Sequence, residues 1–505
     1  MKKKLETKTQ DSNEKTQEPG SKPQDSRRSF IRNTALAAAG FYIVPRHVLG
    51  RGFVAPSDKL QVAGVGAGGK GTSDLKSILE SGKADVAFLC DVDTRSMTES
   101  VKRFPNAKIY KDYREMLDKE HKNIDAVTAS IPDHMHAVVG MAAMQLKKHV
   151  YIQKPLTHDI YEARMLTKAA HDNKVVTQMG NQGSSGDGVR QLQEWYNAGK
   201  IGDVHTINCF TNRPVWPQGI PWSANKPPVP AELDWNLWLG TAPYKDYVEK
   251  LVPFNWRGWW DYGTGALGDM ACHIMAPAFA VLDLGYPISA ECSVATPYIE
   301  NWTRGNFPDS GPVSSSITLT FKGKNGKPDV KLTWMDGGIL PTRPEELGPN
   351  EMLGDGGDGG AVFMGSKGKM MCGTYGKMPT LLPTSLTAQA NVPKTIARVP
   401  NGEAGHQAAW VEACLAGYGS KEAKNLSSNF DIAGPLTESV LMGNLAIRSY
   451  NIGIKAKDAR GRDVTNYPGR GIKLLWDGPN MKVTNFDEAN QFVKRTYRDG
   501  YSLGV

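Results

Sequence analysis

Asp269 and His273 lie four residues apart in a segment that should be helical, so their side chains share one face. Histidine titrates near neutral pH, and an adjacent carboxylate can orient the ring and favour its charged form. Such a pair suits removal of a proton from a hydroxyl group. The same spacing also occurs in surface contacts without chemistry, so the interpretation depends on what lies beside the pair.

A glycine-rich turn, residues 66–71 (GAGGKG), follows a predicted strand at 60–66 and precedes a predicted helix at 72–81. This is the context in which such glycines bind a dinucleotide. The first glycine permits the tight turn, the second lets a pyrophosphate approach, and the last lets helix and strand pack closely. The predicted phosphate-binding residues are Gly66, Gly68, Gly69, Lys70 and Gly71.

A second predicted strand, residues 85–90, ends at Asp91. An acid at this position would bind the ribose hydroxyls of the adenosine and repel a 2′-phosphate. Asp91 therefore favours NAD over NADP as the cofactor. Arg95 is close enough in sequence to keep NADP as the alternative.

Further alternation of strands and helices up to residue 173 predicts a parallel, doubly wound sheet, in which ligands bind at the carboxyl ends of strands. Residues 130–136 and 153–155 fall at two such ends. His134 and His136 could also suggest a metal, but no third clear ligand accompanies them, and we predict no metal site. The remaining predicted cofactor-binding residues are Pro132, His136, Gln153, Lys154 and Asn181.

Eight of the twelve tryptophans lie between Trp195 and Trp260. Flat aromatic faces suit the apolar faces of sugar rings, although large aromatics can also simply fill an irregular region. We predict that Arg257 and Trp259 lie nearest the substrate.

In the order and spacing of its motifs, the chain resembles the Gfo/Idh/MocA oxidoreductases over most of residues 58–500. The resemblance implies that Lys154, Asp269 and His273 surround the reacting carbon, with Lys154 stabilising developing charge on the oxygen. The family usually has Glu-Lys-Pro where this chain has Gln153-Lys154-Pro155, a change that could alter the contact of the lysine. The motifs are GAGGKG, Cys90-Asp91-Val92-Asp93, Tyr113–Leu117, SIPDHMH, Gln153–Leu156 and Gly268–His273.

The predicted fold is α/β: a Rossmann domain at 56–180, then an α+β domain at 181–505 with an open, mostly antiparallel sheet, as the resemblance implies. Late helices are expected to pack back on the body, one at 434–450 with Pro435 in its first turn, and one at 485–501. The glycine-rich segment 353–360 could be a lid or a plain connection.

Residues 1–55 are expected to be a disordered leader with a twin-arginine signal, Ser26–Ile31, followed by a short apolar stretch. Such a signal exports a folded protein, so we expect a periplasmic location and a cofactor that travels with the protein. Cleavage of the signal and its retention as an anchor both stay open, and no other transmembrane span is predicted.

The function predicted from these features is hydride transfer between a hydroxyl carbon of a small-molecule sugar or glycoside and tightly bound NAD(P), regenerated in place. The alternatives are a redox-neutral, NAD-dependent glycosidase and a non-catalytic sugar-binding protein. Basic residues are interspersed with acidic ones, so no nucleic-acid partner is expected. We expect a homo-oligomer.

Overall fold

The computed structural model describes residues 58–504. Residues from Asp58 onward pack as one compact unit. The predicted leader and its twin-arginine motif lie outside the described residues. The domain boundary predicted at residue 180 stays a prediction, because the residues on both sides of it belong to the same compact unit.

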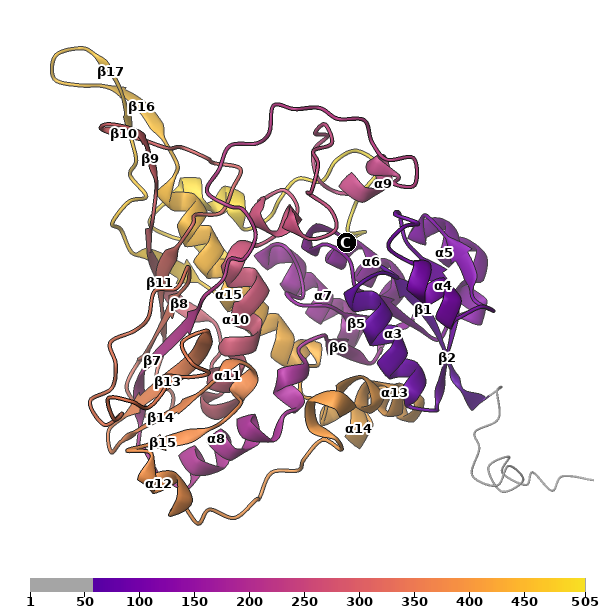
Figure 1. The fold of residues 1–505 in the computed structure, drawn as a ribbon, viewed down its shortest axis with the longest axis horizontal. Helices are drawn as coiled ribbons and strands as arrows, with labels where there is room; N and C mark the ends of the chain where they lie inside the picture. Colours follow the sequence, from indigo (N-terminus) through magenta and orange to yellow (C-terminus); the bar gives the residue numbers. More distant parts are fainter. Residues whose placement is uncertain (1–57, 505) are drawn as a thin grey trace, which may run out of the picture. The chain divides into compact units, whose positions relative to one another are not determined.

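A six-stranded, all-parallel sheet occupies the first part of this unit (Figure 1), in the strand order β3-β2-β1-β4-β5-β6. Strand β1 is almost entirely buried, as expected for a parallel strand covered on both faces. The predicted Rossmann fold is confirmed. Its strands are β1 (Leu60–Val65), β2 (Ala84–Cys90), β3 (Lys108–Tyr110), β4 (Ala126–Ala129), β5 (His149–Ile152) and β6 (Thr177–Met179), and its helices are α3 (Lys70–Glu80), α4 (Thr98–Arg103), α5 (Tyr113–Glu120), α6 (Asp133–Gln145) and α7 (Ile160–Asn173).

A nine-stranded mixed sheet follows, in the order β15-β14-β13-β7-β12-β11-β8-β18-β19, in which only β7 and β12 pair in parallel. Buried and half-buried residues alternate along β11, so one face packs on the core. The predicted open, mostly antiparallel sheet is confirmed. Its strands are β7 (Val204–Thr211), β8 (Pro287–Val294), β11 (Ser315–Phe321), β12 (Val330–Met335), β13 (Gly359–Gly365), β14 (Lys369–Cys372), β15 (Thr380–Leu382), β18 (Leu474–Asp477) and β19 (Lys482–Val483).

Smaller elements connect or flank the two sheets. Two short hairpins, β9/β10 and β16/β17, lie beyond one end of strands β8 and β11 of the large sheet (Figure 1). These elements are α8 (Asp187–Asn197), β9 (Tyr298–Glu300), β10 (Thr303–Arg304), α9 (Trp235–Leu239), α10 (Gly265–Ile274), α11 (Ala276–Leu282), α12 (Ser385–Ala388), α14 (Lys421–Lys424), β16 (Ile454–Lys457) and β17 (Asp463–Asn466).

Helix α15 (Phe430–Tyr450) is buried on most sides and packs against α7, α10 and β8. The predicted start at residue 434 was wrong. Asn429 caps the helix, because its side-chain oxygen accepts hydrogen bonds from the backbone N–H groups of Asp431 and Ile432. Pro435 therefore lies inside the helix rather than at its first turn.

The helix predicted at 485–501 was also wrong, since only Asp487–Phe492 form a short 3-10 helix. Asn490 bonds the backbone N–H and carbonyl of Val483 at 2.8 and 3.0 Å. Farther on, the Arg495 guanidinium bonds Glu162 on α7 at 2.7 Å. These contacts hold the segment in an irregular path, and tertiary bonds outweigh its helical preference.

The glycine-rich segment at 353–360 is held at several points and leads into β13. Leu353 is buried, the Asp355 carboxylate accepts a hydrogen bond from the Thr374 N–H at 3.1 Å, and the Asp358 carbonyl accepts one from the Asn212 N–H at 2.9 Å. These contacts favour the plain connection over the lid.

Helix α13 (His406–Ala416), although late in the chain, packs on α3 and β1 of the Rossmann sheet (Figure 1). Its Trp410 is fully buried, with its ring 5.6 Å from that of Tyr151 on β5. The helix thus supplies part of the apolar layer under the parallel sheet.

We predict that Trp410→Ala lowers the free energy of unfolding by about 3–5 kcal/mol, because it leaves a large cavity under the sheet. Leu415→Ala is the control, since Leu415 lies on the same helix but is 43% exposed; its effect should stay within about 1 kcal/mol. Chemical denaturation of both variants measures the difference. Equal losses would show that α13 does not carry the core as described.

Candidate active site

The glycine turn joins β1 to α3. Gly66 has a φ of 79°, in the left-handed region, and its N–H donates to the Cys90 carbonyl at 2.8 Å. A Cβ on Gly71 would lie 1.8 Å from the carbonyl oxygen of Gly66, and one on Gly68 would lie 2.6 Å from the Ser96 side chain. Strand and helix therefore approach at distances that only glycine allows.

The N-terminus of α3 is open for an anion. Gly69 occupies the N-cap position without a side-chain cap, the first turn has no acidic residue, and a Cβ on Gly69 would meet nothing within 4 Å. Free N–H groups at a helix start attract phosphate. Lys70 follows, 44% exposed and paired with Asp74. The turn thus fits the pyrophosphate of a dinucleotide.

Asp91 lies at the end of β2 beside this turn. Its carboxylate accepts hydrogen bonds from the backbone N–H groups of Ala67 and Asp93, both at 2.9 Å. Burial raises the pKa of Asp91, while these hydrogen bonds oppose the rise. Arg95 makes a two-point contact with Asp93, at 2.8 and 2.6 Å. Its charge is therefore already balanced, which weakens the NADP alternative.

Lys154, at the end of β5, reaches across to α10 in the second half of the chain. Its ammonium donates to the backbone carbonyl and the carboxylate of Asp269, each at 2.7 Å. The Arg257 Nε donates to the same carboxylate oxygen at 3.2 Å. Burial alone would raise the pKa of Asp269, but the Lys154 and Arg257 cations lower it to about 2. Asp269 is therefore ionised, and two of the three Lys154 donors are used.

His273 is held by Asn181 and not by Asp269, which corrects the expected Asp269–His273 contact. The His273 Nδ1 lies 2.6 Å from the Asn181 side-chain oxygen. The Asn181 amide nitrogen in turn donates to the Cys272 carbonyl at 2.7 Å, which fixes the amide orientation. Nδ1 must then carry the hydrogen, and Nε2 keeps its lone pair.

Asp269 does favour the charged form of His273, as expected, but two other effects outweigh it. Burial and the Lys154 ammonium hold the pKa of His273 well below its ordinary value, against the opposing effect of Asp269. Asn181, predicted to bind the cofactor, thus orients the neutral His273 ring. This pairing could not be predicted from sequence spacing, because Asn181 and His273 are 92 residues apart.

His136 and Pro132 shape the loops around the site. Pro132 directly precedes α6, and the buried His136 ring contacts the carbonyls of Pro155 and Ile131 at 2.7 and 2.8 Å. His136 thereby ties two strand-end loops together. His134 is buried as well and contacts the Trp238 carbonyl. Among residues 58–504, no group of three or more His, Cys, Asp or Glu side chains could hold a metal ion.

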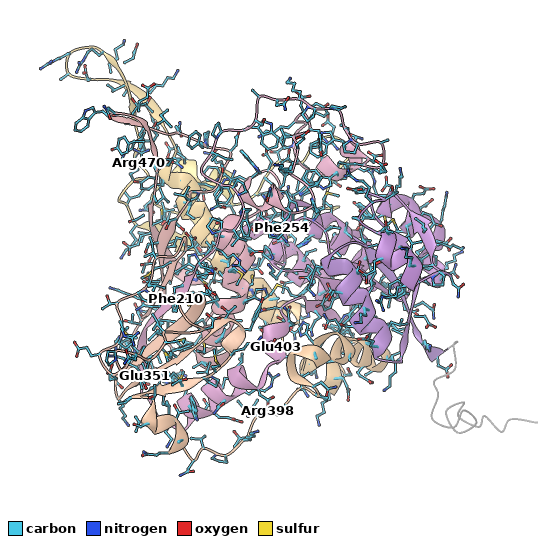
Figure 2. The ribbon with its side chains drawn as sticks, in the orientation of Figure 1. Phe210, Phe254, Glu351, Arg398, Glu403 and Arg470 are labelled. Atoms are coloured by element: carbon cyan, nitrogen blue, oxygen red, sulfur yellow. The ribbon has the colours of Figure 1, made fainter. Side chains whose placement is uncertain are left out.

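The two predicted substrate residues lie in different surroundings. Arg257 joins the Lys154–Asp269 pair, and its guanidinium lies 4.5 Å from the ring centre of Phe254, which Figure 2 labels. Trp259 is buried in an aromatic cluster, with its ring 4.6 Å from that of Trp222. Arg257 is therefore next to the candidate catalytic groups, and Trp259 supports the wall around them.

Two further residues at the site escaped the sequence analysis. The Tyr375 ring lies 4.6 Å from that of His273, on a turn where Tyr375 has a φ of 66°. Asp74 is fully buried on α3 and bonds Gln153, the residue before Lys154, at 2.7 Å. The one sequence signal for Asp74 is that an acidic residue is unusual on the inner face of a predicted helix.

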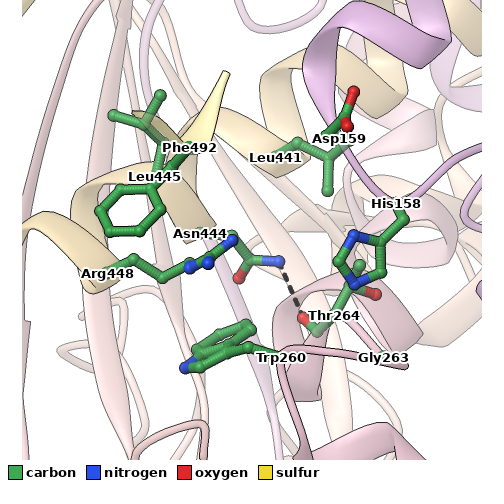
Figure 3. Close-up of a pocket in the computed structure, with 10 residues that line it drawn as sticks. All are labelled: His158, Asp159, Trp260, Gly263, Thr264, Leu441, Asn444, Leu445, Arg448 and Phe492. Atoms are coloured by element: carbon green, nitrogen blue, oxygen red, sulfur yellow. Dashed lines mark hydrogen bonds between the residues drawn. The ribbon is translucent and has the colours of Figure 1, made fainter. Parts of the chain in front are cut away.

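A small cavity lies behind the start of α10 (Figure 3), where the Asn444 amide donates to the Thr264 carbonyl at 2.8 Å. The Asn444 oxygen and both His158 ring nitrogens have no hydrogen-bond partner among the described residues. The cavity volume of about 10 Å³ suits a single water molecule. It is too small to be the substrate site.

Comparison with known proteins finds matches to two segments of the chain. Residues 60–181 match a family model described as an oxidoreductase family, NAD-binding Rossmann fold, and residues 203–301 match the C-terminal alpha/beta domain of the same family. The first segment is therefore an NAD-binding Rossmann domain, in agreement with the predicted cofactor.

Among curated proteins, a levoglucosan dehydrogenase from Pseudarthrobacter phenanthrenivorans is 24% identical over 243 residues, 48% of this chain and 52% of the relative. A myo-inositol 2-dehydrogenase from Thermotoga maritima is 23% identical over 158 residues, 31% of this chain and 47% of the relative. The chain thus spans about half the length of these relatives.

Among solved structures, a WlbA dehydrogenase from Chromobacterium violaceum in complex with NADH and UDP-GlcNAcA superposes with a TM-score of 0.53 at 14% identity, covering 82% of this chain and 97% of that one. At this identity the similarity concerns the fold.

Within the described residues, no single helix is long and apolar enough to cross a membrane. Only the bent pair α10 and α11, taken together, has sufficient length and apolar composition.

We predict that Asp91→Ser raises the dissociation constant of NAD about tenfold, since it removes a charged hydrogen-bond acceptor beside the glycine turn. Binding of NADP should weaken less, because the repelling charge is also lost. Asp85→Ser, on the same strand but in a half-buried pair with Lys59, is the control. Titration calorimetry with both dinucleotides measures the effect, and an unchanged NAD to NADP ratio would contradict it.

Proposed function

We propose that the protein oxidises a hydroxyl carbon of a sugar or glycoside with NAD, because residues 60–181 and 203–301 match the two domain models of the Gfo/Idh/MocA oxidoreductases. The observation that carries the proposal is the convergence of Lys154, Asp269 and His273 beside the glycine turn, from both halves of the chain. NAD, when bound, supplies the hydride acceptor, so the described residues need to bind the alcohol and remove its proton.

Each of the three residues has a separate task in this proposal. The remaining N–H of Lys154 donates to the substrate oxygen and stabilises its developing negative charge. The Nε2 atom of neutral His273 accepts the hydroxyl proton. A carbonyl would remain once the hydride had also left the same carbon. Asp269, ionised and bound to Lys154, keeps the ammonium in place and does not take the proton, because its pKa is about 2.

A cyclic, hydroxyl-rich substrate is supported by the surroundings of the site. The buried aromatic cluster that includes Trp222 and Trp259 forms a rigid wall behind Arg257, and aromatic faces suit sugar rings. The similar proteins named above include dehydrogenases of levoglucosan and myo-inositol.

Export belongs to the proposal as well. The twin-arginine motif, Ser26–Ile31, supports transport of the folded protein to the periplasm with NAD already bound. NAD would then be regenerated in place, by a second carbonyl substrate or by a partner protein. We also propose a homo-oligomer, which sedimentation of the purified protein would test.

Near-ultraviolet absorbance tests the proposed reaction. Addition of the correct sugar or glycoside to the purified protein should raise the absorbance of reduced nicotinamide, and denaturation should release NAD. Lys154→Ala and His273→Ala should each lower turnover by at least about a hundredfold while NAD stays bound, because they remove charge stabilisation or the base. Asp85→Ser should keep full activity, because Asp85 pairs with Lys59 and contacts none of the proposed catalytic residues.

Two outcomes would oppose the proposal. Release of free sugar without any absorbance change would favour the redox-neutral glycosidase. Normal turnover in both the Lys154 and the His273 variant would refute the assignment of these residues.

The pH dependence of kcat/KM tests the neutral state of His273. Because its pKa lies well below 6.5, the base form persists and the acidic limb should lie well below pH 6.5. Asn181→Asp places a carboxylate beside Nδ1, which favours imidazolium and should move this limb to higher pH. An acidic limb at the same pH in both proteins would contradict the assigned contact.

A further inference from the structure

Asp74 is a fully buried carboxylate that gathers donors from four parts of the fold. Its two oxygens accept hydrogen bonds from four side chains. One lies in the glycine turn, one just after β4, one just after β5, and one near the start of α13. A buried carboxylate needs such partners, because an uncompensated charge in the interior is costly. The donors are Lys70, Ser130 at 3.0 Å, Gln153 at 2.7 Å and Gln407 at 2.9 Å.

Gln153 links this carboxylate to the residue that the proposed reaction needs. Its amide nitrogen donates to Asp74, and its oxygen lies 3.4 Å from the backbone nitrogen of Lys154. A Cβ on Gly180 would lie 2.5–2.7 Å from the Gln153 amide, so the amide is packed directly against the Gly180 backbone. The side chain of Gln153 is therefore held in one orientation, and Lys154 is the next residue along the backbone.

We propose that Asp74 is a positioning residue, which sets Lys154 through Gln153, and that its charge is the reason for an amide at position 153. A glutamate there would place two carboxylates at hydrogen-bonding distance in a buried site, where both cannot stay ionised. The departure from Glu-Lys-Pro thus leaves the contact between positions 74 and 153 with one carboxylate, which is carried by α3.

The arrangement also connects the two ligand regions. Lys70 begins α3, where the pyrophosphate is expected, and Asp74 lies one helical turn later on the same helix. The pyrophosphate region is therefore connected to Gln153, and through it to the neighbouring Lys154, by direct contacts of Asp74. The catalytic part of this inference rests on the proposed function, but the Asp74–Gln153 contact does not.

A charge-exchange cycle tests the proposal with the variants Asp74→Asn, Gln153→Glu and the double variant. Asp74→Asn and Gln153→Glu should each lower kcat at least about tenfold, with NAD binding weakened less, because Lys154 loses its support. The double variant again has one carboxylate facing one amide. It should recover at least half of the logarithmic loss in kcat and most of the melting temperature.

Glu194→Gln is the matched control. Glu194 is also a buried carboxylate, held by Arg398 at 2.7 Å and by the backbone N–H groups of Thr395 and Ile396, away from the site. Its variant should lower the melting temperature without changing kcat, measured well below that temperature.

The outcomes separate the two proposals. Losses in the double variant equal to the product of the single losses would show that positions 74 and 153 are not coupled and would overturn the inference. Recovery of the melting temperature without recovery of kcat would reduce Asp74 to a structural residue. If the unaltered protein oxidises no sugar, the proposed function fails. The melting-temperature cycle and the NAD dissociation constants then still decide whether Asp74 and Gln153 are coupled.

Discussion

The ion pair between Lys154 and Asp269 is the contact on which the site depends. Both side chains are more than four-fifths buried, and they come from elements 115 residues apart. Removing such charges from water is costly, and the cost is offset only by close, well-directed partners. The end of β5 and helix α10 must therefore pack so that the ammonium meets both the carboxylate and the carbonyl of Asp269.

Charge balance around this pair explains the roles of its neighbours. Asp269 pairs with both Lys154 and Arg257, and Asp74 pairs with Lys70, so these carboxylates are used in holding cations. Burial raises the pKa of Asp133, the other acid beside the site, whose carboxylate accepts a hydrogen bond from Thr264 at 2.6 Å. His273, kept neutral, is the group left with a free lone pair.

Local patterns predicted the fold well and the site in part. The glycine turn, the parallel sheet and Asp91 follow from residues close in sequence, where the backbone itself dictates the conformation. The partner of His273 could not be predicted, because helix spacing indicated Asp269 while the folded chain supplies Asn181 from another element. The helix predicted at 485–501 was wrong for the same reason, because Arg495 is held by Glu162, 333 residues away.

A neutral histidine beside a lysine has a consequence for the direction of the reaction. Lys154 disfavours the imidazolium that forms when His273 accepts a proton, so the proton is released or returned readily. A base with a depressed pKa is weak for removing a proton, but its conjugate acid is correspondingly strong for donating one. In the reaction proposed above, the same residue would then serve both oxidation of an alcohol and reduction of a carbonyl. The proposed regeneration of the cofactor, by a second carbonyl compound at the same site, depends on both directions.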